Sequence, residues 1–508
     1  MLLPSSRCLS VSPSKHLPDR DTFLELCSRH NVVPVWREVM ADLQTPVAAF
    51  LRLDPQPNGF LLESVEGGER WARYSFLGGD AFATVTARRG RVEVEGTPPV
   101  LPQEKEAPLA YIRRLLEAFD APKLEGLPPL HGGAVGFLGY DVVRELEAIG
   151  DEPPDDLGLP DAALILTRTF VVFDHLKQKA FVITNVASPD DPEDAYCDAQ
   201  RRCDEVVERL GAPLDLPQVE LQLEADVDFE SSVDDPEYCS WVERAKEHVE
   251  AGDVFQVVPA RRFDTALDGS ALDAYRALRA MNPSPYMYFL RFGATGEHPG
   301  FDIAGSSPEP LVRVTGDEVI SRPIAGTRRR GSSAQEDAAL EKELLSDEKE
   351  RAEHVMLVDL ARNDVGRVAE WGSVEVDELM IVERYSHVMH IVSSVRGRLA
   401  RGKSAFDALL ACFPAGTVSG APKVRAMQII DSLEKTKRGP YAGVVGYFDF
   451  SGNLDTCITI RTIVATGGRA YVQAGAGVVA DSVPSEEAEE TRRKAEALLR
   501  AAAAARYL

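Results

Sequence analysis

The chain has 508 residues, of which 44% are apolar, and its 56 basic and 81 acidic side chains give a formal charge of −25. This apolar content excludes a disordered chain, and the length is that of about two to four domains or of two large ones. Because an acidic surface repels phosphate backbones and anionic lipid head groups, we expect neither nucleic acid nor a membrane as a partner.

The apolar runs of the sequence are too short for a transmembrane helix, which needs about 18 residues. No continuous apolar stretch near the start is typical of a signal peptide, so we expect a cytoplasmic protein. The seven cysteines are scattered and form no C-x-x-C pair, which argues against a disulfide scaffold and against a zinc site.

The expected elements begin after a polar segment at residues 1–30, which we expect to be a flexible lead. Residues 31–225 follow as an N-terminal region in which strand-like runs alternate with helical stretches. The strand-like runs are residues 81–87, 164–173 and 180–184, and the helix is residues 110–119. Residues 212–236 carry three prolines and a cluster of acids, which is typical of a linker.

The remaining region, residues 226–508, starts with an expected helix at 236–250 and continues as strand-like segments punctuated by glycine and proline. A run of five alanines from Ala501 is expected to extend a final helix. Hairpin-like spacing, in place of a regular alternation of strand and helix, predicts an α+β fold with antiparallel sheets covered by helices.

A glycine pattern near the end of the chain, residues 475–480, matches the dinucleotide fingerprint. A dinucleotide fold needs a helix and then another strand ending in an acid, about 20 residues further on, and only one helix is expected here. We therefore interpret Gly475 and Gly477 as positions that expose backbone N–H groups and let a ligand approach closely.

Two pairs of glutamates, Glu350 with Glu353 and Glu487 with Glu490, have the i,i+3 spacing that places both carboxylates on one face of a helix. Each pair alone is typical of a solvated helix face. The second pair also follows Ser485, an expected N-cap, where acids suit the helix dipole. Four converging carboxylates would instead form an Mg²⁺ site that an anionic substrate completes. The residues alone leave both interpretations open.

Two histidines, His387 and His390, lie in a segment whose neighbours favour a strand. Residues three apart on a strand face opposite ways, so one of them can face a site. A neutral imidazole suits acid–base work near pH 7, although a hydrogen-bonded structural histidine is the commoner case. Residues 321–330 form a basic island, which is either a solvated loop or an attractor for a carboxylated ligand.

The second half of the chain resembles the component I family of anthranilate synthases, within the chorismate-utilising enzymes. The resemblance covers about residues 226–505, and residues 61–64 and 136–140 extend it into the first half. The matching segments are RPIAGT at 322–327, EHVMLVDLARND at 353–364, RYSHVMH at 384–390, FPAGT at 413–417, SGAPK at 419–423, IR at 460–461 and QAGAG at 473–477.

The resemblance implies a sandwich of antiparallel sheets covered by helices, and a reaction in two stages. Ammonia adds to chorismate with loss of the ring hydroxyl, and elimination of pyruvate then yields anthranilate. By the same resemblance Mg²⁺ is the cofactor, surrounded by Glu350, Glu353, Glu487 and Glu490, and His390 assists departure of the hydroxyl as an acid.

The resemblance also implies which residues hold the substrate. Tyr441 and Arg461 would bind the enolpyruvyl carboxylate, helped by the backbone N–H groups of Gly475 and Gly477. Further residues expected to line the site are Gln256, Ala325, Thr327, Thr417 and Lys423.

Two positions argue for ammonia as the nucleophile. Relatives on the para-aminobenzoate branch often carry lysine where Ala325 stands, and isochorismate and salicylate synthases carry lysine at the place of Gln256. Alanine cannot attack the ring, and glutamine cannot activate water as a base. Because no glutaminase segment is visible, a separate glutamine amidotransferase subunit is the expected source of ammonia. The alternatives are component I of aminodeoxychorismate synthase and a non-catalytic sensor of tryptophan or chorismate.

Two further segments resemble the family's tryptophan-binding elements. Glu63 and Ser64 would bind the ammonium group of an amino acid, and Pro283, Pro285 and Met287 would contact its indole. Ordinary packing explains the same residues, as leucines entering a core and prolines shaping a turn. The resemblance favours feedback inhibition by tryptophan at a site separate from the Mg²⁺ site.

Overall fold

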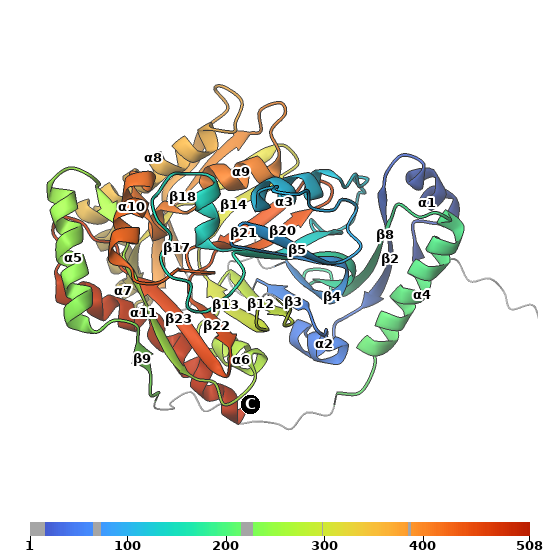
Figure 1. Ribbon diagram of the computed structural model, residues 1–508, viewed down its shortest axis with the longest axis horizontal. Helices are drawn as coiled ribbons and strands as arrows, with labels where there is room; N and C mark the ends of the chain where they lie inside the picture. The colour runs from blue at the N-terminus through green and yellow to red at the C-terminus, as the bar shows by residue number, and fades with distance from the viewer. Residues whose placement is uncertain (1–15, 65–72, 215–226, 297, 385–387) are drawn as a thin grey trace, which may run out of the picture.

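The computed structural model describes residues 16–64, 73–214, 227–296, 298–384 and 388–508 (Figure 1). The helices in these ranges are α1 Arg20–Cys27, α2 Pro46–Leu53, α3 Pro108–Glu117, α4 Pro192–Leu210, α5 Asp235–Glu250, α6 Ala271–Met281, α7 Ala334–Ser346, α8 Glu348–Gly366, α9 Ala405–Cys412, α10 Lys423–Leu433 and α11 Pro484–Ala504. Short 3₁₀ segments are η1 Tyr140–Glu145, η2 Gly416–Val418 and η3 Ala505–Tyr507.

The strands of the first half are β1 His16–Leu17, β2 Val32–Met40, β3 Gly59–Glu63, β4 Tyr74–Arg88, β5 Arg91–Gly96, β6 Gly133–Leu138, β7 Ala162–Asp174 and β8 Lys179–Ala187. Those of the second half are β9 Glu230–Ser231, β10 Gln256–Val257, β11 Ala260–Ala266, β12 Tyr286–Phe292, β13 Phe301–Ser307, β14 Pro310–Thr315, β15 Glu318–Ser321, β16 Ile324–Arg329, β17 Glu375–Arg384, β18 Val388–Arg398, β19 Gly420–Ala421, β20 Val444–Asp449, β21 Leu454–Ile458, β22 Thr462–Thr466 and β23 Arg469–Gly475.

Every strand pairing among the described residues is antiparallel, which confirms the predicted type of sheet. Strand β7 joins the two arms of the sheet, because it pairs with β4 and with β6, and it also pairs with β8. One arm runs from β6 through β20, β21, β14 and β15 to β18, which also pairs with β16 and β17. The other arm runs from β4 through β3, β12, β13, β22 and β23 to β11.

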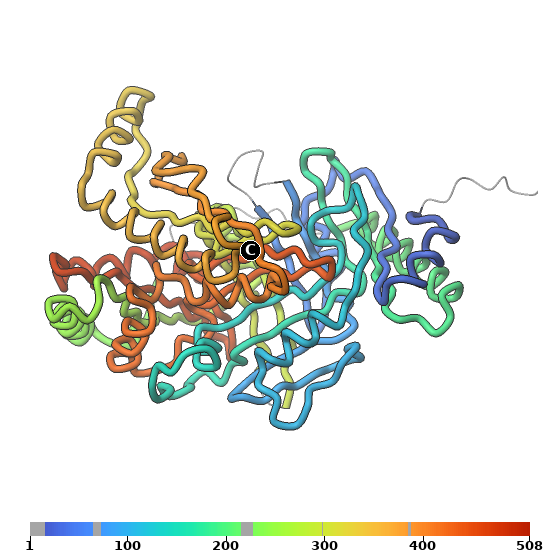
Figure 2. The backbone as a smooth tube through the Cα atoms, turned by 90° about the horizontal axis from the view of Figure 1, so that it is seen from above, coloured from blue at the N-terminus to red at the C-terminus, as the bar shows by residue number. Residues whose placement is uncertain are grey.

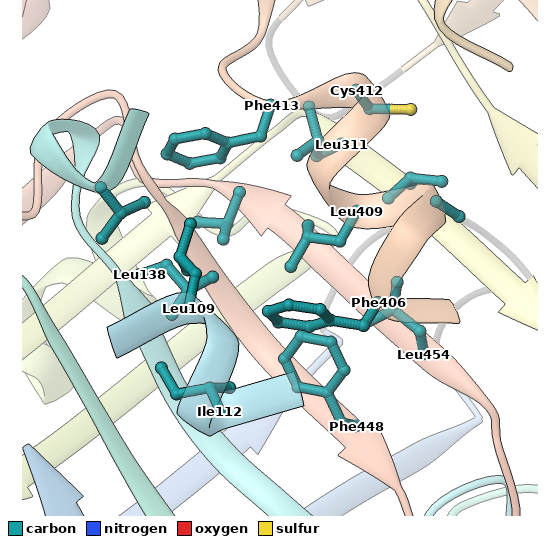
Figure 3. Close-up of a cluster of buried hydrophobic side chains, with 14 of the residues drawn as sticks. Leu109, Ile112, Leu138, Leu311, Phe406, Leu409, Cys412, Phe413, Phe448 and Leu454 are labelled. Carbon is teal, nitrogen blue, oxygen red and sulfur yellow. The ribbon is translucent and has the colours of Figure 1, made fainter. Parts of the chain in front are cut away.

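The two arms pack face to face around an aromatic-rich core. Phe137 of β6 meets Phe301 of β13 edge to face, with ring centroids 6.0 Å apart, and both side chains are buried. On the outer face of the β6 arm, α3 and α9 bury Ile112 and Phe406 over β20 (Figure 3). Helices α2, α6 and α11 cover the other arm. The fold is therefore the expected sandwich of antiparallel sheets covered by helices.

The two sequence regions, 31–225 and 226–508, share these sheets and do not form separate cores. Leu61 of β3 lies opposite Phe289 of β12, and Gly136 of β6 lies opposite Gly446 of β20. Both regions therefore contribute strands to the same sheets.

Residues 16–30 differ from the flexible lead that we expected over 1–30. Asp19 accepts a hydrogen bond from the Thr22 N–H and caps α1, and Phe23 is fully buried against Tyr196 of α4. The apolar face of this short helix is therefore covered, which the polar composition of the segment conceals. Residues 1–15 lie outside the described residues, and so do residues 215–226 of the predicted linker.

The expected helices at 110–119 and 236–250 are α3 and α5, and the alanine run from Ala501 extends α11. Helices α1 and α4 lie at one end of the molecule, and α5, α10 and the start of α11 lie at the other, as two perpendicular views show (Figures 1 and 2). No helix in the described ranges combines the length and the apolarity that crossing a bilayer requires.

Candidate active site

A cavity of about 440 Å³ brings together residues from α8, α11, β16, β18 and β23, in the half of the molecule opposite α1 and α4 (Figure 1). All of the predicted catalytic, substrate-binding and metal-binding residues except Lys423 line it. They are Gln256, Ala325, Thr327, Glu350, Glu353, His390, Thr417, Tyr441, Arg461, Gly475, Gly477, Glu487 and Glu490.

Lys423, at the start of α10, does not line this cavity. Its ammonium group donates hydrogen bonds to Asp364 Oδ2 at 2.7 Å and to the Cys412 carbonyl at 2.9 Å. Lys423 therefore ties α10 to α8 and to the end of α9, which is a structural role that a sequence motif cannot distinguish from a catalytic one.

The four glutamates lie on α8 and α11, as their spacing predicted. Burial raises the pKa of Glu353, and the negative charges of Glu350 and Glu490 raise it further. Burial likewise raises the pKa of Glu487, with Glu490 adding to the shift. Because carboxylates of one helix act on those of the other, the two pairs share one electrostatic environment. The expected Ser485 cap is wrong, since α11 begins at Pro484 with Val483 as its N-cap.

The carboxylates have protein partners of their own. Glu350 Oε1 accepts from Arg328 at 2.8 Å, and Glu353 Oε1 accepts from Gln256 Nε2 at 3.4 Å. Glu490 pairs with Lys494 at 2.7 Å. Within the described residues no three His, Cys, Asp or Glu side chains meet at metal-binding spacing.

The donor set nevertheless fits Mg²⁺ in its chemistry, because it consists of hard carboxylate oxygens around a cavity that can hold water and an anion. The mutual repulsion that raises the pKa of Glu353 is what a bound cation would relieve.

His390 lies on β18, opposite Thr327 of β16 in the antiparallel ladder. Its Nδ1 is 3.1 Å from the Gly326 carbonyl and 3.0 Å from Thr327 Oγ1. Because a carbonyl only accepts, we assign the ring proton to Nδ1. Burial lowers the pKa of His390, and the charge of Arg461 lowers it further, so the ring is mainly neutral at pH 7. His387 lies outside the described residues.

The basic island is not a solvated loop, because residues 324–329 form strand β16. Its arginines are paired with acids of α7, α8 and β17. Arg329 pairs with Glu336 at 2.5 Å, and Arg330 pairs with Asp337 at 2.8 Å. Their charges are therefore compensated within the protein, which weakens the interpretation of the island as an attractor for an anionic ligand.

Glu309, between β13 and β14, lines the same cavity and was not among the residues predicted from the sequence. Burial raises its pKa to about 7, although a hydrogen bond from Thr417 Oγ1 at 2.9 Å and the charge of Lys494 act in the opposite direction. Glu309 is therefore partly protonated at neutral pH. A lone glutamate between Pro308 and Pro310 carries no local signal of this, because the shift arises from burial by distant segments.

One wall of the cavity suits a carboxylate. Arg461 has a φ of +51° and forms no ion pair among the described residues, and burial lowers its pKa. Burial raises the pKa of Tyr441 to about 12, so its phenol keeps its proton. A Cβ on Gly477 would lie 2.4 Å from Gln256 Nε2, so a larger residue here would require the end of the Gln256 side chain to move. A guanidinium that forms no ion pair among the described residues and lies beside a phenol is well placed to bind an anion.

A second cavity, of about 350 Å³, lies between the two arms and contains most of the predicted tryptophan site. Glu63, Ser64, Pro285 and Met287 line it, whereas Pro283 does not. Glu63 already accepts from the Tyr275 hydroxyl at 2.6 Å and from Arg279 at 3.1 Å, and Met287 is 1% exposed. Ser64 Oγ is buried and has no hydrogen-bond partner among the described residues.

The chain matches the family model of chorismate binding enzymes over residues 60–500. Similar curated proteins include anthranilate synthase component 1 from Acetivibrio thermocellus, 47% identical over 489 residues, or 95% of this chain and 98% of the relative. The same component from Mycolicibacterium smegmatis is 47% identical over 494 residues, 96% of this chain and 94% of the relative. The chain belongs to the family of chorismate-binding enzymes.

A solved structure supports the same relationship. The crystal structure of anthranilate synthase component I from Streptococcus pneumoniae superposes with a TM-score of 0.75 at 38% identity, and covers 91% of this chain and 99% of that one. The similarity therefore extends over most of the fold.

Proposed function

We propose that this chain is the chorismate-binding component of an anthranilate synthase, which converts chorismate and ammonia to anthranilate and pyruvate. The observation that carries the proposal is the single cavity in which four glutamates, the pair of Glu309 and His390, and Arg461 meet. The names of the relatives support the same activity.

The direct test is a single turnover of chorismate with Mg²⁺ and ammonium, followed by anthranilate fluorescence. Anthranilate as the main product is expected. Isochorismate or aminodeoxychorismate as the main product would overturn the assignment.

The proposed cofactor is Mg²⁺, with Glu350, Glu353, Glu487 and Glu490 as the residues that would hold it. When bound, the ion would neutralise these carboxylates and bind the ring carboxylate of the substrate, which a protein of charge −25 otherwise repels. Arg461 and Tyr441 are proposed to hold the enolpyruvyl carboxylate, so the two carboxylates of chorismate would fix the ring at two points in the cavity.

The first stage needs a proton donor for the departing hydroxyl and an acceptor for a proton from the attacking ammonia. Glu309 can donate, because a pKa of about 7 keeps its carboxyl partly protonated at neutral pH. The neutral ring of His390 can accept, with Nδ1 bound to the Gly326 carbonyl. We propose this division of roles on the principle that two groups with oppositely shifted pKa values form an acid and base pair. It differs from the acid role that the resemblance implied for His390.

The cavity also supports ammonia as the nucleophile. Ala325 and Gln256 both line it, and neither has an amine to attack the ring or a base to activate water. This argues against aminodeoxychorismate synthase component I. A non-catalytic sensor would not need Glu309 and His390, whose desolvation shifts both pKa values toward the uncharged forms.

A separate amidotransferase subunit is the proposed source of ammonia. The described helices and strands belong to the sandwich and its helical cover, and leave no described segment for a glutaminase. We expect the purified chain to form anthranilate from chorismate and ammonium salts but not from glutamine. The comparison is a product assay with either nitrogen source at equal chorismate. Efficient use of glutamine by the chain alone would contradict the two-subunit proposal.

Tryptophan is proposed to bind the second cavity and to inhibit. The two cavities share no lining residue among the described residues, so inhibition has to favour a state that binds chorismate less well. The coupling expected for such a pair of sites is about 5- to 150-fold in affinity.

We expect Ser64→Leu to relieve this inhibition, because the larger side chain enters the cavity beside Pro285 and removes a buried hydroxyl that a ligand could satisfy. The measurement is the apparent KM for chorismate with increasing tryptophan, in the parent and the variant. Turnover without tryptophan should be unchanged, and Ser64→Ala, which keeps the space, should remain partly sensitive. Equal sensitivity of the parent and Ser64→Leu would contradict the assignment.

A further inference from the structure

One arginine connects the strand that supports His390 to the helix that carries the first pair of glutamates. Arg328 of β16 donates to Glu350 Oε1 from Nη1 at 2.8 Å, to Asp347 Oδ2 from Nη2 at 2.8 Å and to Glu343 Oε1 from Nε at 3.1 Å. The hydroxyl of its neighbour, Thr327, contacts His390. A single stretch of β16 therefore contacts both the proposed proton acceptor and a proposed metal ligand.

The two oxygens of Glu350 have different surroundings. Oε1 is held by Arg328, which does not line the catalytic cavity, whereas Glu350 itself does. Oε2 lies over Gly326, where a Cβ would come within 3.2 Å of it. Gly326 has a φ of +71°, so glycine is favoured at this position by the backbone as well as by the close approach. Arg328 thus holds the carboxylate through one oxygen and leaves the other unbound by the guanidinium.

The guanidinium of Arg328 also bridges three carboxylates that would otherwise repel one another. One guanidinium faces three carboxylates at the junction of α7 and α8, so the local balance stays negative even with Arg328 present. Asp347 additionally caps α8 by accepting from the backbone N–H groups of Lys349 and Glu350. Without the Arg328 guanidinium, repulsion would drive the Glu350 side chain away from Glu343 and Asp347. The positions of its carboxylate oxygens would then change.

We propose that Arg328 is a positioning residue of the metal site: it fixes the Glu350 carboxylate by Oε1 so that Oε2 is available to a divalent cation in the cavity. The inference rests on the proposed Mg²⁺ site and adds to it a residue outside the cavity wall. Partners of metal ligands are commonly worth about 10- to 100-fold in metal affinity, because they set the orientation of the ligand.

The test is direct Mn²⁺ binding to the purified chain without chorismate, with free Mn²⁺ followed by electron paramagnetic resonance. Mn²⁺ prefers the same oxygen ligands as Mg²⁺ and gives a signal. We expect Arg328→Gln to weaken binding about 10- to 100-fold. The Mn²⁺ affinity of Arg328→Lys should lie between those of the parent and Arg328→Gln, because an ammonium group cannot reproduce the three contacts of the guanidinium.

Arg329→Gln is the matched control. It removes one positive charge from the next residue of the same strand, but Arg329 pairs with Glu336 and does not contact Glu350. Its Mn²⁺ affinity should stay within about twofold of the parent, since exposed charges act weakly at a distance. A second readout is turnover, where saturating Mg²⁺ should restore the kcat of Arg328→Gln.

Three outcomes would overturn the inference. Unchanged Mn²⁺ affinity in Arg328→Gln would make the contact a surface ion pair, and tighter binding would make Arg328 a competitor of the metal. A loss of affinity accompanied by an equal loss in Arg329→Gln would point to net charge alone. The proposed metal site itself would fail in a different way. Either the parent would not bind Mn²⁺, or Glu353→Gln would not weaken that binding.

Discussion

Glu309→Gln is expected to lower anthranilate formation about 10²- to 10⁴-fold, the usual contribution of a positioned proton donor, while leaving the fold intact. The amide keeps the shape of the carboxyl and its contact with Thr417, but it has no titratable proton. The measurement is kcat with ammonium as the nitrogen source, at saturating chorismate and Mg²⁺. Glu318→Gln removes an exposed carboxylate of β15 as a control and should leave turnover unchanged.

The same substitution should stabilise the protein in alkaline solution. Burial raises the pKa of Glu309 from its ordinary value of 4.5, which applies to the unfolded chain, to about 7 in the folded chain. The folded state therefore binds this proton more tightly than the unfolded state does. Stability therefore falls as the pH rises from 4.5 through 7, by at most about 3 kcal/mol for this group. Glutamine avoids that cost, so the gain in Tm should be present at pH 8 and absent at pH 4. A variant that retains turnover, or that loses Tm at pH 8, would contradict the assignment of Glu309.

Glu353→Gln is expected to abolish most turnover, by about 100-fold or more, and to remove saturable Mn²⁺ binding. Burial raises the pKa of Glu353, and carboxylates of both helices, Glu350 of α8 and Glu490 of α11, raise it further. Because burial already disfavours its ionised form, the neutral amide should not lower the Tm. The measurements are kcat, Mn²⁺ affinity and thermal unfolding of one preparation.

Glu348→Gln provides the control for this change, since it removes an exposed carboxylate from the first turn of the same helix. It should bind Mn²⁺ as the parent does. Full activity of Glu353→Gln, or of the parent in excess chelator, would exclude the proposed cofactor site.

Local sequence patterns predicted the secondary structure that carries much of the candidate site. The i,i+3 spacing placed Glu350 with Glu353, and Glu487 with Glu490, on single helix faces, and the β-branched neighbours of His390 indicated a strand. These predictions succeeded because helix and strand periodicity depend on residues a few positions apart. The family motif at 419–423 suggested a place in the site for Lys423. Its side chain instead donates a hydrogen bond to Asp364 and does not line the cavity.

Other features were decided only by the tertiary structure. The helix α1 within residues 16–30 is held by Phe23 packing on Tyr196, about 170 positions away along the chain, and the two sequence regions proved to share their sheets. Sequence composition signals which residues are apolar, but it does not show which distant surface will cover them.

The proposed acid and base, Glu309 and His390, show the division between sequence and structure most clearly. The sequence by itself determined that His390 lies on a strand and that four glutamates lie on two helices, and its resemblance to a family assigned them to one site. Only the tertiary structure decided that Glu309 joins them with a pKa of about 7, and that Glu63 is already occupied by Tyr275 and Arg279. The physical reason is that burial, ion pairing and pKa depend on segments that meet in space, whereas the periodicity of helices and strands depends on residues close together in the sequence.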